Sequence, residues 1–167
     1  PEGHTVIDIG GGSTDIAILS LNEIVASTSI RVASNKFDED IIKYVKRKFN
    51  LLIGDKTAEN IKKEVGSAME VPINENISTK IKGKDLVTGI PKTIDITSNQ
   101  INEAIKDSVN EIILALKEVL EKCPPELSSD ILDNGIILTG GGSLIRNLDK
   151  LIENKVNIPI HRATNSL

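Results

Sequence analysis

The sequence has little that would link it to a membrane, an oxidising compartment or nucleic acid. Its single cysteine, Cys123, permits no internal disulfide, which fits a reducing compartment. No apolar stretch approaches the roughly 18 to 20 residues of a membrane span, and the first residues lack the pattern of a signal peptide. The 24 acidic and 20 basic residues give a formal charge of −4, unlike the strongly basic surfaces that bind nucleic acid. We therefore expect a cytoplasmic protein without a nucleic-acid partner.

Aromatic residues are also scarce, with two phenylalanines, one tyrosine and no tryptophan, so the core must consist of Ile, Leu, Val and Ala. The only locally basic stretch is "KYVKRK", residues 43–48. Its charges alternate with apolar residues at helical spacing, which favours a solvated helix face over a phosphate-binding stripe. With 167 residues, of which 39% are hydrophobic, the chain suffices for one domain, or for a domain with a small inserted subdomain.

The first part of the chain has the pattern of a three-stranded antiparallel meander followed by two helices. Ser34 or Asn35 is the expected N-cap of the first helix, with acidic residues in its first turn. Gly66 is the expected C-cap of the second helix. The expected elements are strands 4–9, 14–20 and 23–30 and helices 34–49 and 57–66.

The second part begins with a half-buried hairpin and continues into a long helix. Thr97 and Gln100 have capping-box spacing at the start of this helix, and Pro124 and Pro125 end it. The expected elements are a hairpin within 72–97, helices from 98 and near 126–133, a strand at 135–139, a helix at 143–154 and a strand at 158–161.

This order of elements predicts an α/β sheet that carries a small α+β subdomain. Strands and a helix come first, and a strand–helix–strand alternation comes last. We expect residues 1–34 and 97–167 to form the larger α/β subdomain and residues 35–96 to be inserted as the smaller one.

Two glycine triplets stand at the ends of apolar strands. Gly10, Gly11 and Gly12 follow "VIDI" and precede a second strand, so their backbone N–H groups can form a nest for phosphate oxygens. Gly140–Gly142 follow "IILT" and precede a helix, whose N-terminus would favour an anion. Neither triplet is a Walker loop or a GxGxxG motif, and each alone is a weak signal that more often marks a tight turn than a phosphate site. Together they favour a nucleotide.

Asp8 lies on the strand that enters the first triplet, and Asp15 lies on the strand that leaves it. Mg²⁺ keeps most of its water and recruits only one or two carboxylates, so Asp8 can hold it through water. Alternatively, Asp8 is a strand-end residue that accepts hydrogen bonds from local N–H groups.

Five stretches in the right order resemble the C-terminal half of an MreB-type bacterial actin: "VIDIGGGSTDIAI", "TAENIKKEVGSA", "DLVTGIPKTIDIT", "EKCPPELSSDI" and "GIILTGGGSLIRNLDKLI". "PPELSSDI" and "LTGGGSLIRNLD" are specific to that group within the wider actin, Hsp70 and sugar-kinase fold. The resemblance implies an actin-like/Hsp70-like ATPase lobe, which is ribonuclease H-like. It also implies a subunit of an ATP-dependent filament that guides cell-wall synthesis and maintains cell shape.

The resemblance further implies a site for ATP or ADP with Mg²⁺, in which Asp8 lies near the metal and the attacking water as the catalytic carboxylate. Glu59 and Lys62 match positions that embrace the ribose and base; from their spacing alone they would be an ordinary surface ion pair. The loops implied to bind the nucleotide are Gly10, Gly11, Gly12 and Ser13 at the phosphates and Gly140, Gly141 and Gly142 at the adenosine.

The chain also departs from the family pattern. It reads Ala33-Ser34-Asn35 where the family usually has Ala-Gly-Asp, and it lacks the usual glycine near Glu23. The family's first phosphate loop, water-positioning acid and membrane-binding helix belong to its N-terminal half, and its next helix should begin at "HRATNSL". We therefore expect this piece to bind ATP weakly and not to hydrolyse it.

The implied partners are further copies of the same chain in a head-to-tail filament, with cell-wall synthesis and membrane proteins for the full-length protein at the membrane. Leu86, Val87 and Ile90 of the hairpin insert are the expected centre of the filament contact, unless they close the insert's own small core. Two other interpretations stay open: the nucleotide lobe of an Hsp70-like or cell-division relative, and a nucleotide-independent interaction module.

Overall fold

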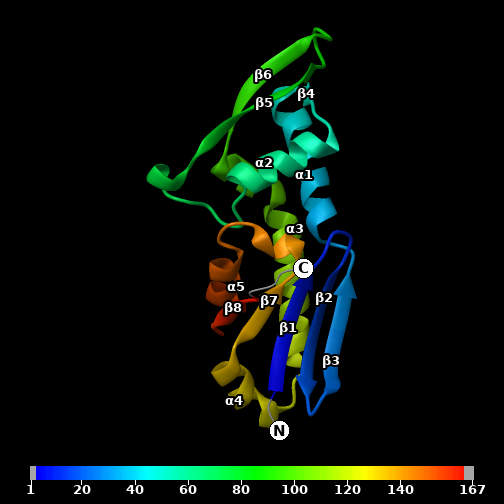
Figure 1. Ribbon diagram of the computed structural model, residues 1–167, viewed down its shortest axis with the longest axis vertical. Helices are drawn as coiled ribbons and strands as arrows, with labels where there is room; N and C mark the ends of the chain where they lie inside the picture. Colours follow the sequence, from blue (N-terminus) through cyan, green and yellow to red (C-terminus); the bar gives the residue numbers. More distant parts are fainter. Residues whose placement is uncertain (1–2, 164–167) are drawn as a thin grey trace.

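The computed structural model describes residues 3–163, which contain a five-stranded and a three-stranded β-sheet (Figure 1). The larger sheet has the strand order β3-β2-β1-β7-β8. The first three of its strands form the predicted antiparallel meander, and β7 and β8 are added in parallel to β1. Its strands are β1 (Gly3–Ile9), β2 (Thr14–Ser20), β3 (Glu23–Ile30), β7 (Ile136–Thr139) and β8 (Ile160–Arg162).

One face of the larger sheet is buried against the long helix α3 (Ser98–Glu121), which contacts β2 and β3. Alternate residues of the strands supply this buried face, as a period of two requires. The predicted capping box between Thr97 and Gln100 is present at the start of α3. The fully buried side chains on the sheet face include Ile7, Ile9, Ile16, Ile18, Ile136 and Leu138.

The smaller sheet lies at the other end of the molecule, beside helices α1 (Ser34–Phe49) and α2 (Asp55–Val65) (Figure 1). The predicted hairpin is formed by β5 (Ser78–Asp85) and β6 (Pro91–Thr97), and it is half-buried as expected. A third strand, β4 (Leu51–Leu52), pairs with β5 and was not predicted, because two residues carry no readable alternation. A short 3₁₀ turn, η1 (Ile73–Glu75), precedes the hairpin.

Helix α1 (Ser34–Phe49) begins in a way the sequence did not indicate. Its N-cap is Ala33 without a side-chain hydrogen bond, and its first turn has no acidic residue, so both expectations were wrong. The reason is tertiary: the N–H groups of Ser34 and Asn35 donate to carbonyl oxygens of the first glycine loop, which replace a side-chain cap. Helix α2 (Asp55–Val65) starts two residues before the predicted Thr57 and has the predicted C-cap at Gly66.

The segment after the second glycine triplet is not the single helix predicted at 143–154. It forms a 3₁₀ turn, η2 (Gly141–Leu144), and then α5 (Leu148–Val156), because Asn147 adopts a left-handed conformation between them. The second triplet therefore leads into a short turn, and the predicted α-helix N-terminus for an anion is absent at that position. The predicted short helix is present as α4 (Pro125–Asn134), which has Pro124 as its N-cap and begins at Pro125.

The strands of the larger sheet come from residues 3–30 and 136–162, and those of the smaller sheet from residues 51–97. One cluster of buried side chains includes residues of both sheets, such as Ile7 in the larger sheet and Ile96 in the smaller one. The subdomain division at residues 34/35 and 96/97 stays a prediction. None of the helices within residues 3–163 is long and apolar enough to cross a membrane.

Candidate functional site

The two glycine loops lie side by side because they follow neighbouring parallel strands, β1 and β7. Asp8 near the end of β1 is in register with Thr139 at the end of β7. Gly140 has a φ of +89°, and a Cβ placed there would lie 2.5 Å from Asp8 Oδ1 and against the carbonyl oxygen of Ile9. A Cβ on Gly142 would meet Gly10 O at 3.2 Å. Glycine is required at Gly140 both for its backbone conformation and for this close approach.

The first loop turns its carbonyl groups toward α1. Gly10 N donates to Ser13 O (3.0 Å) and closes the turn, while Gly10 O and Gly11 O accept from Ser34 N (3.1 Å) and Asn35 N (2.8 Å). The N–H groups of Gly11 and Gly12 donate no hydrogen bond within residues 3–163. Both glycines are exposed, so the loop offers free amide donors, the groups that phosphate oxygens need.

Helix α2 forms the opposite wall and carries Glu59 and Lys62. The Lys62 side chain is 7% exposed, and its Nζ lies 2.8 Å from Asp38 Oδ1 and 2.6 Å from Ser34 Oγ. Glu59 instead pairs with Lys63, with 2.9 Å between Oε1 and Nζ. The Glu59–Lys62 ion pair suggested by spacing is therefore wrong, because each residue has another partner.

The charges around Glu59 keep its carboxylate ionised. The hydrogen bond from Lys63 is the main cause that lowers the pKa of Glu59, and the nearby charge of Lys56 contributes next. An ionised carboxylate at the edge of a cavity is a hydrogen-bond acceptor for hydroxyl groups, such as those of a sugar.

Two adjoining cavities, of about 360 and 220 Å³, lie between α2 and the glycine loops. They share several lining residues and so form a continuous cleft. One end is apolar and the other is rich in glycine and charged groups. The larger cavity is lined by Ser34, Glu59, Lys62, Lys63, Gly141, Gly142, Leu144 and Ile145. The smaller one is lined by Gly10, Gly11, Ser34, Asn35, Asp38, Glu59, Lys62, Gly141 and Gly142.

Six of the predicted site residues line this cleft and four do not. The lining residues are Gly10, Gly11, Glu59, Lys62, Gly141 and Gly142, while Asp8, Gly12, Ser13 and Gly140 lie beside it.

Asp8 is exposed, and its carboxylate forms no hydrogen bond or ion pair in the part of the chain that the structure describes. This observation disfavours the alternative in which Asp8 accepts hydrogen bonds from local N–H groups. Asp15 is directly opposite Asp8 in the β1–β2 pairing, which brings two carboxylates to the same sheet face. Like charges in this arrangement repel, and a bound cation relieves the repulsion.

No group of three or more His, Cys, Asp or Glu side chains that could hold a metal ion occurs among residues 3–163. Asp8 alone suffices for a magnesium ion held through water, because Mg²⁺ keeps most of its hydration shell. The residues present therefore fit a magnesium ion that a ligand's phosphates also bind, and the metal assignment of Asp8 stays a prediction.

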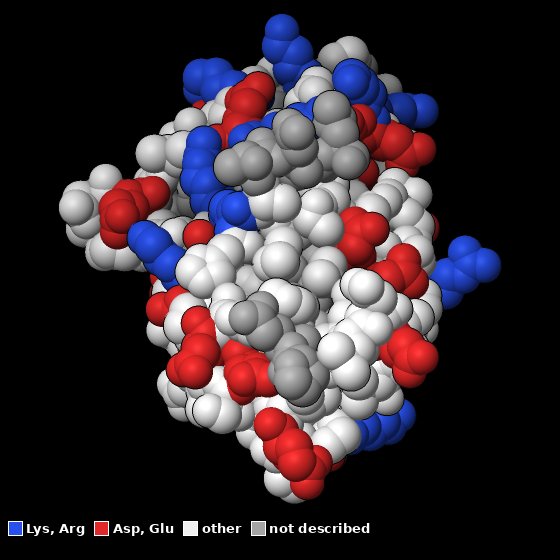
Figure 2. Space-filling view, turned by 60° about the horizontal axis from the view of Figure 1, so that its bottom comes forward, with Lys and Arg blue, Asp and Glu red and all other residues white. Residues whose placement is uncertain are grey.

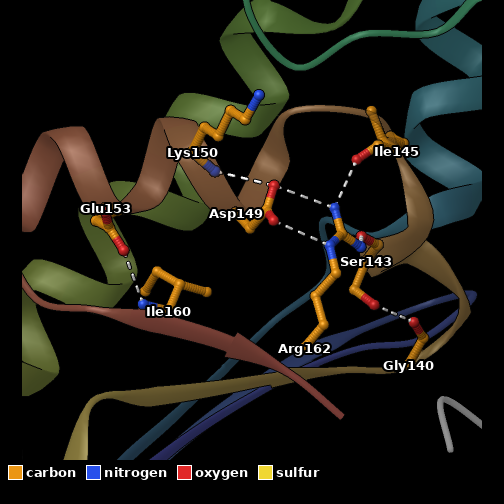
Figure 3. Close-up of polar contacts among 8 residues, drawn as sticks. All are labelled: Gly140, Ser143, Ile145, Asp149, Lys150, Glu153, Ile160 and Arg162. Carbon is orange, nitrogen blue, oxygen red and sulfur yellow. Dashed lines mark hydrogen bonds and ion pairs between the residues drawn. The ribbon is translucent and has the colours of Figure 1, made fainter. Parts of the chain in front are cut away.

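No pattern in the sequence pointed to Arg162, which lies at the end of β8 and contacts the loop after the second glycine triplet (Figure 3). Its guanidinium donates to the carbonyl oxygens of Ser143 and Ile145, the latter at 3.1 Å, and its Nε lies 3.3 Å from Asp149 Oδ2. Ser34 and Asn35 were predicted as helix caps and noted as departures from the family pattern, but neither was predicted as a site residue. Both line the cleft. Such contacts join separate elements, so no local spacing reveals them.

The surface charges agree with the expectation for the basic stretch. Lys43, Lys46, Arg47 and Lys48 are exposed on α1, whereas Tyr44 between them is buried, as on a solvated helix face. On the face seen in Figure 2, basic side chains gather mainly toward the top, with acidic side chains among them, and acidic side chains predominate below.

A family model described as MreB/Mbl protein matches residues 1–167. The chain is 47% identical over 167 residues to the cell shape-determining protein Mbl of Bacillus subtilis, covering all of this chain and 50% of the relative. It is 46% identical over 158 residues to the cell shape-determining protein MreB of Escherichia coli, covering 95% of this chain and 45% of the relative. The chain thus spans about half the length of these relatives.

Solved structures give the same result. The crystal structure of MreB5 of Spiroplasma citri bound to ADP matches with a TM-score of 0.95 at 46% identity, over 100% of this chain and 50% of that one. The MamK double helical filament matches with a TM-score of 0.75 at 22% identity, over 98% of this chain and 50% of that one. At that identity the likeness to MamK shows a shared actin-like fold.

Proposed function

Because the chain belongs to the MreB/Mbl family of cell shape-determining proteins, we propose that it forms one half of the ATP-binding site of an actin-like filament subunit. The observation that carries this proposal is the cleft in which two glycine loops face α2. MreB5, at 46% identity over the whole chain, has been solved with ADP and with AMPPNP. Family membership also argues against an Hsp70-like chaperone.

The phosphate groups would lie at the first glycine loop. The N–H groups of Gly11 and Gly12 have no acceptor among the described residues, and Gly141 and Gly142 form the facing backbone of the cleft. Asp8 would hold Mg²⁺ through water, and Asp15 adds negative charge on the same face. When bound, the metal neutralises phosphate charge.

The nucleoside would lie in the larger cavity. Leu144 and Ile145 give this cavity an apolar wall, and Glu59 and Lys62 supply polar groups on the opposite wall. A purine needs apolar contact for its faces, and ribose hydroxyls need an acceptor such as the ionised Glu59 carboxylate. The cavity volume of about 360 Å³ lies in the range of small-molecule sites.

We further propose that the whole protein assembles into head-to-tail filaments in the cytoplasm, at the membrane, where it guides cell-wall synthesis through wall and membrane proteins. Leu86, Val87 and Ile90 at the hairpin tip are 43%, 79% and 62% exposed. Exposure on this scale argues against the alternative in which they close the insert's own core, and it supports a contact surface.

Titration of ADP into the full-length gene product, with and without Mg²⁺, tests the nucleotide proposal. We expect magnesium to tighten binding, and Asp8→Asn to remove most of this effect without changing the unfolding midpoint. Asp95→Asn, an exposed carboxylate on β6, is the matched control. Absence of ADP binding by the wild type would refute the nucleotide site and favour an interaction module. Equal magnesium dependence in Asp8→Asn would refute the metal assignment alone.

A further inference from the structure

Arg162 holds the loop that forms the apolar wall of the cleft (Figure 3). The loop runs from η2 into α5, and two of its carbonyl oxygens, on Ser143 and Ile145, accept hydrogen bonds from the two terminal nitrogens of the guanidinium. Arg162 lines neither cavity, so it contacts the loop outside the cleft.

Asp149, in the first turn of α5, fixes the orientation of the guanidinium. Its Oδ2 lies 3.3 Å from Arg162 Nε, and its Oδ1 accepts from Nη2 at 3.4 Å. The same Oδ1 accepts from Lys150 N at 3.0 Å, which holds the carboxylate in place. Both side chains of the pair are about one-third exposed, so the pair is not a core ion pair whose main effect is global stability.

The far end of the loop is held by the connector that follows α2. Ala68 N donates to Arg146 O at 2.9 Å, and Asn147 Nδ2 donates to Ser67 Oγ at 3.1 Å. The backbone between Gly142 and Asn147 is thus fixed at its far end by α2's connector and along its middle by Arg162. Leu144 projects from this fixed segment with 64% of its surface exposed, and it lines the larger cavity.

We propose that Arg162 is a positioning residue of the nucleotide site, which keeps the Ser143–Ile145 wall in the conformation that receives the nucleoside. The inference rests on the proposed nucleotide function. Only an arginine has the fork of donors that reaches two carbonyl oxygens and a carboxylate at once; a lysine ammonium in the same place is a point charge. A wall that is already ordered spares the ligand the free energy of ordering it.

Removal of the guanidinium makes the competent wall a minor conformation, and the apparent Kd rises by the inverse of its population. We expect Arg162→Gln to weaken ADP binding about tenfold, which corresponds to a competent population of about one-tenth. Arg162→Lys restores only part of the affinity, because it keeps the charge and loses the fork. Asp149→Asn acts through Arg162, so the double variant Arg162→Gln/Asp149→Asn binds no more weakly than Arg162→Gln alone.

The test uses the full-length gene product. It combines ADP titration with amide hydrogen exchange of residues 141–147, measured in the absence of nucleotide. Lys80→Gln, which breaks the exposed Lys80–Asp95 pair on the hairpin, is the control. The proposal expects faster exchange in this segment for Arg162→Gln, slower exchange again when ADP saturates the variant, and an unchanged pattern in the control.

Unchanged exchange together with unchanged ADP affinity in Arg162→Gln would overturn the proposal. Weaker ADP binding would also overturn it if the global unfolding midpoint falls and exchange of the loop matches that of neighbouring segments. If the wild type binds no ADP, the proposed function fails, whereas the exchange measurement still decides whether Arg162 orders the loop. Faster loop exchange with unchanged ADP affinity also refutes the positioning role.

Discussion

At Gly140 the backbone has a φ of +89°, and the space that a side chain would need is occupied by β1. Gly140→Ala forces both a left-handed conformation and a clash with the Ile9 carbonyl, so we expect a loss of about 2–4 kcal/mol in the free energy of unfolding. Gly141→Ala is the matched control, because a Cβ there meets nothing within 4 Å and its φ is not in the left-handed region. Urea denaturation measures both. Equal stabilities of the two variants would show that the loops do not pack as described.

Lys62 and Asp38 form the least exposed ion pair at the cleft, with side chains 7% and 17% exposed. Lys62→Met leaves the Asp38 carboxylate with little water and no cation, and we expect a loss of about 3 kcal/mol in the free energy of unfolding. Lys62→Met/Asp38→Leu removes both charges and should recover most of this loss. Lys63→Met, on the same helix with a 65% exposed side chain, is the control. If Lys62→Met is as stable as the wild type, little-hydrated Asp38 does not need the lysine charge, and the expected role of the pair is contradicted.

Single residues were predictable where their signal is local. The glycine triplets and Asp8 stand in short motifs, and the structure brings both triplets to the ends of adjacent strands. The partners of Lys62 were not predictable, because Asp38 lies 24 positions earlier on another helix. Arg162 was missed for the same reason. Its acceptors are backbone oxygens, which every residue has, so the sequence does not show which loop Arg162 contacts.

At the scale of elements, boundaries were predicted correctly where side chains specify them. Thr97 and Gln100 cap α3 through their own side chains, and Gly66 ends α2. The start of α1 was mispredicted because backbone carbonyls of the glycine loop cap it, and these can be located only after the chain has folded. The break before α5 depends on a left-handed Asn147 that α-helical periodicity masks.

The contact between β8 and α5 should make stability depend on pH. Burial alone would raise the pKa of Asp149, but the hydrogen bond from Arg162, the Lys150 N–H and the charge of Arg162 together lower it below the usual 3.8. Because the native pKa is lowered, this group stabilises the fold above pH 3.8, and the stabilisation is lost as the pH falls through the native pKa.

Accordingly, the difference in unfolding free energy between the wild type and Asp149→Asn should be constant near neutral pH and shrink in acid. Urea denaturation from pH 7 down to about pH 3 measures this difference. In the Arg162→Gln background the acid-dependent part should diminish, because the cation that lowers the pKa has been removed. A difference that grows as the pH falls would contradict the assigned sign.

At the scale of the whole molecule, the larger sheet and the hairpin tip lie at opposite ends (Figure 1). The order of elements predicted an α/β sheet with an inserted α+β part, and the family motifs predicted the actin-like fold. The proposed assembly surface follows less directly from the sequence, because the exposure of the hairpin residues depends on how the chain folds. An interface that joins opposite ends of successive copies repeats without closing, which is the geometry of a filament.

Val87 is the most exposed of the three apolar side chains at this tip, at 79%. The Val87→Glu variant of the full-length gene product should fold normally, because the side chain has little packing to lose. It should pellet less after ATP addition, because a charge would be buried in the contact. Leu114→Glu makes the same change at a 59% exposed residue of α3, away from the tip, and should pellet normally. Circular dichroism and sedimentation measure the two properties. Normal folding with normal pelleting of Val87→Glu would reject the interface, whereas loss of folding would show that Val87 belongs to the core of the insert.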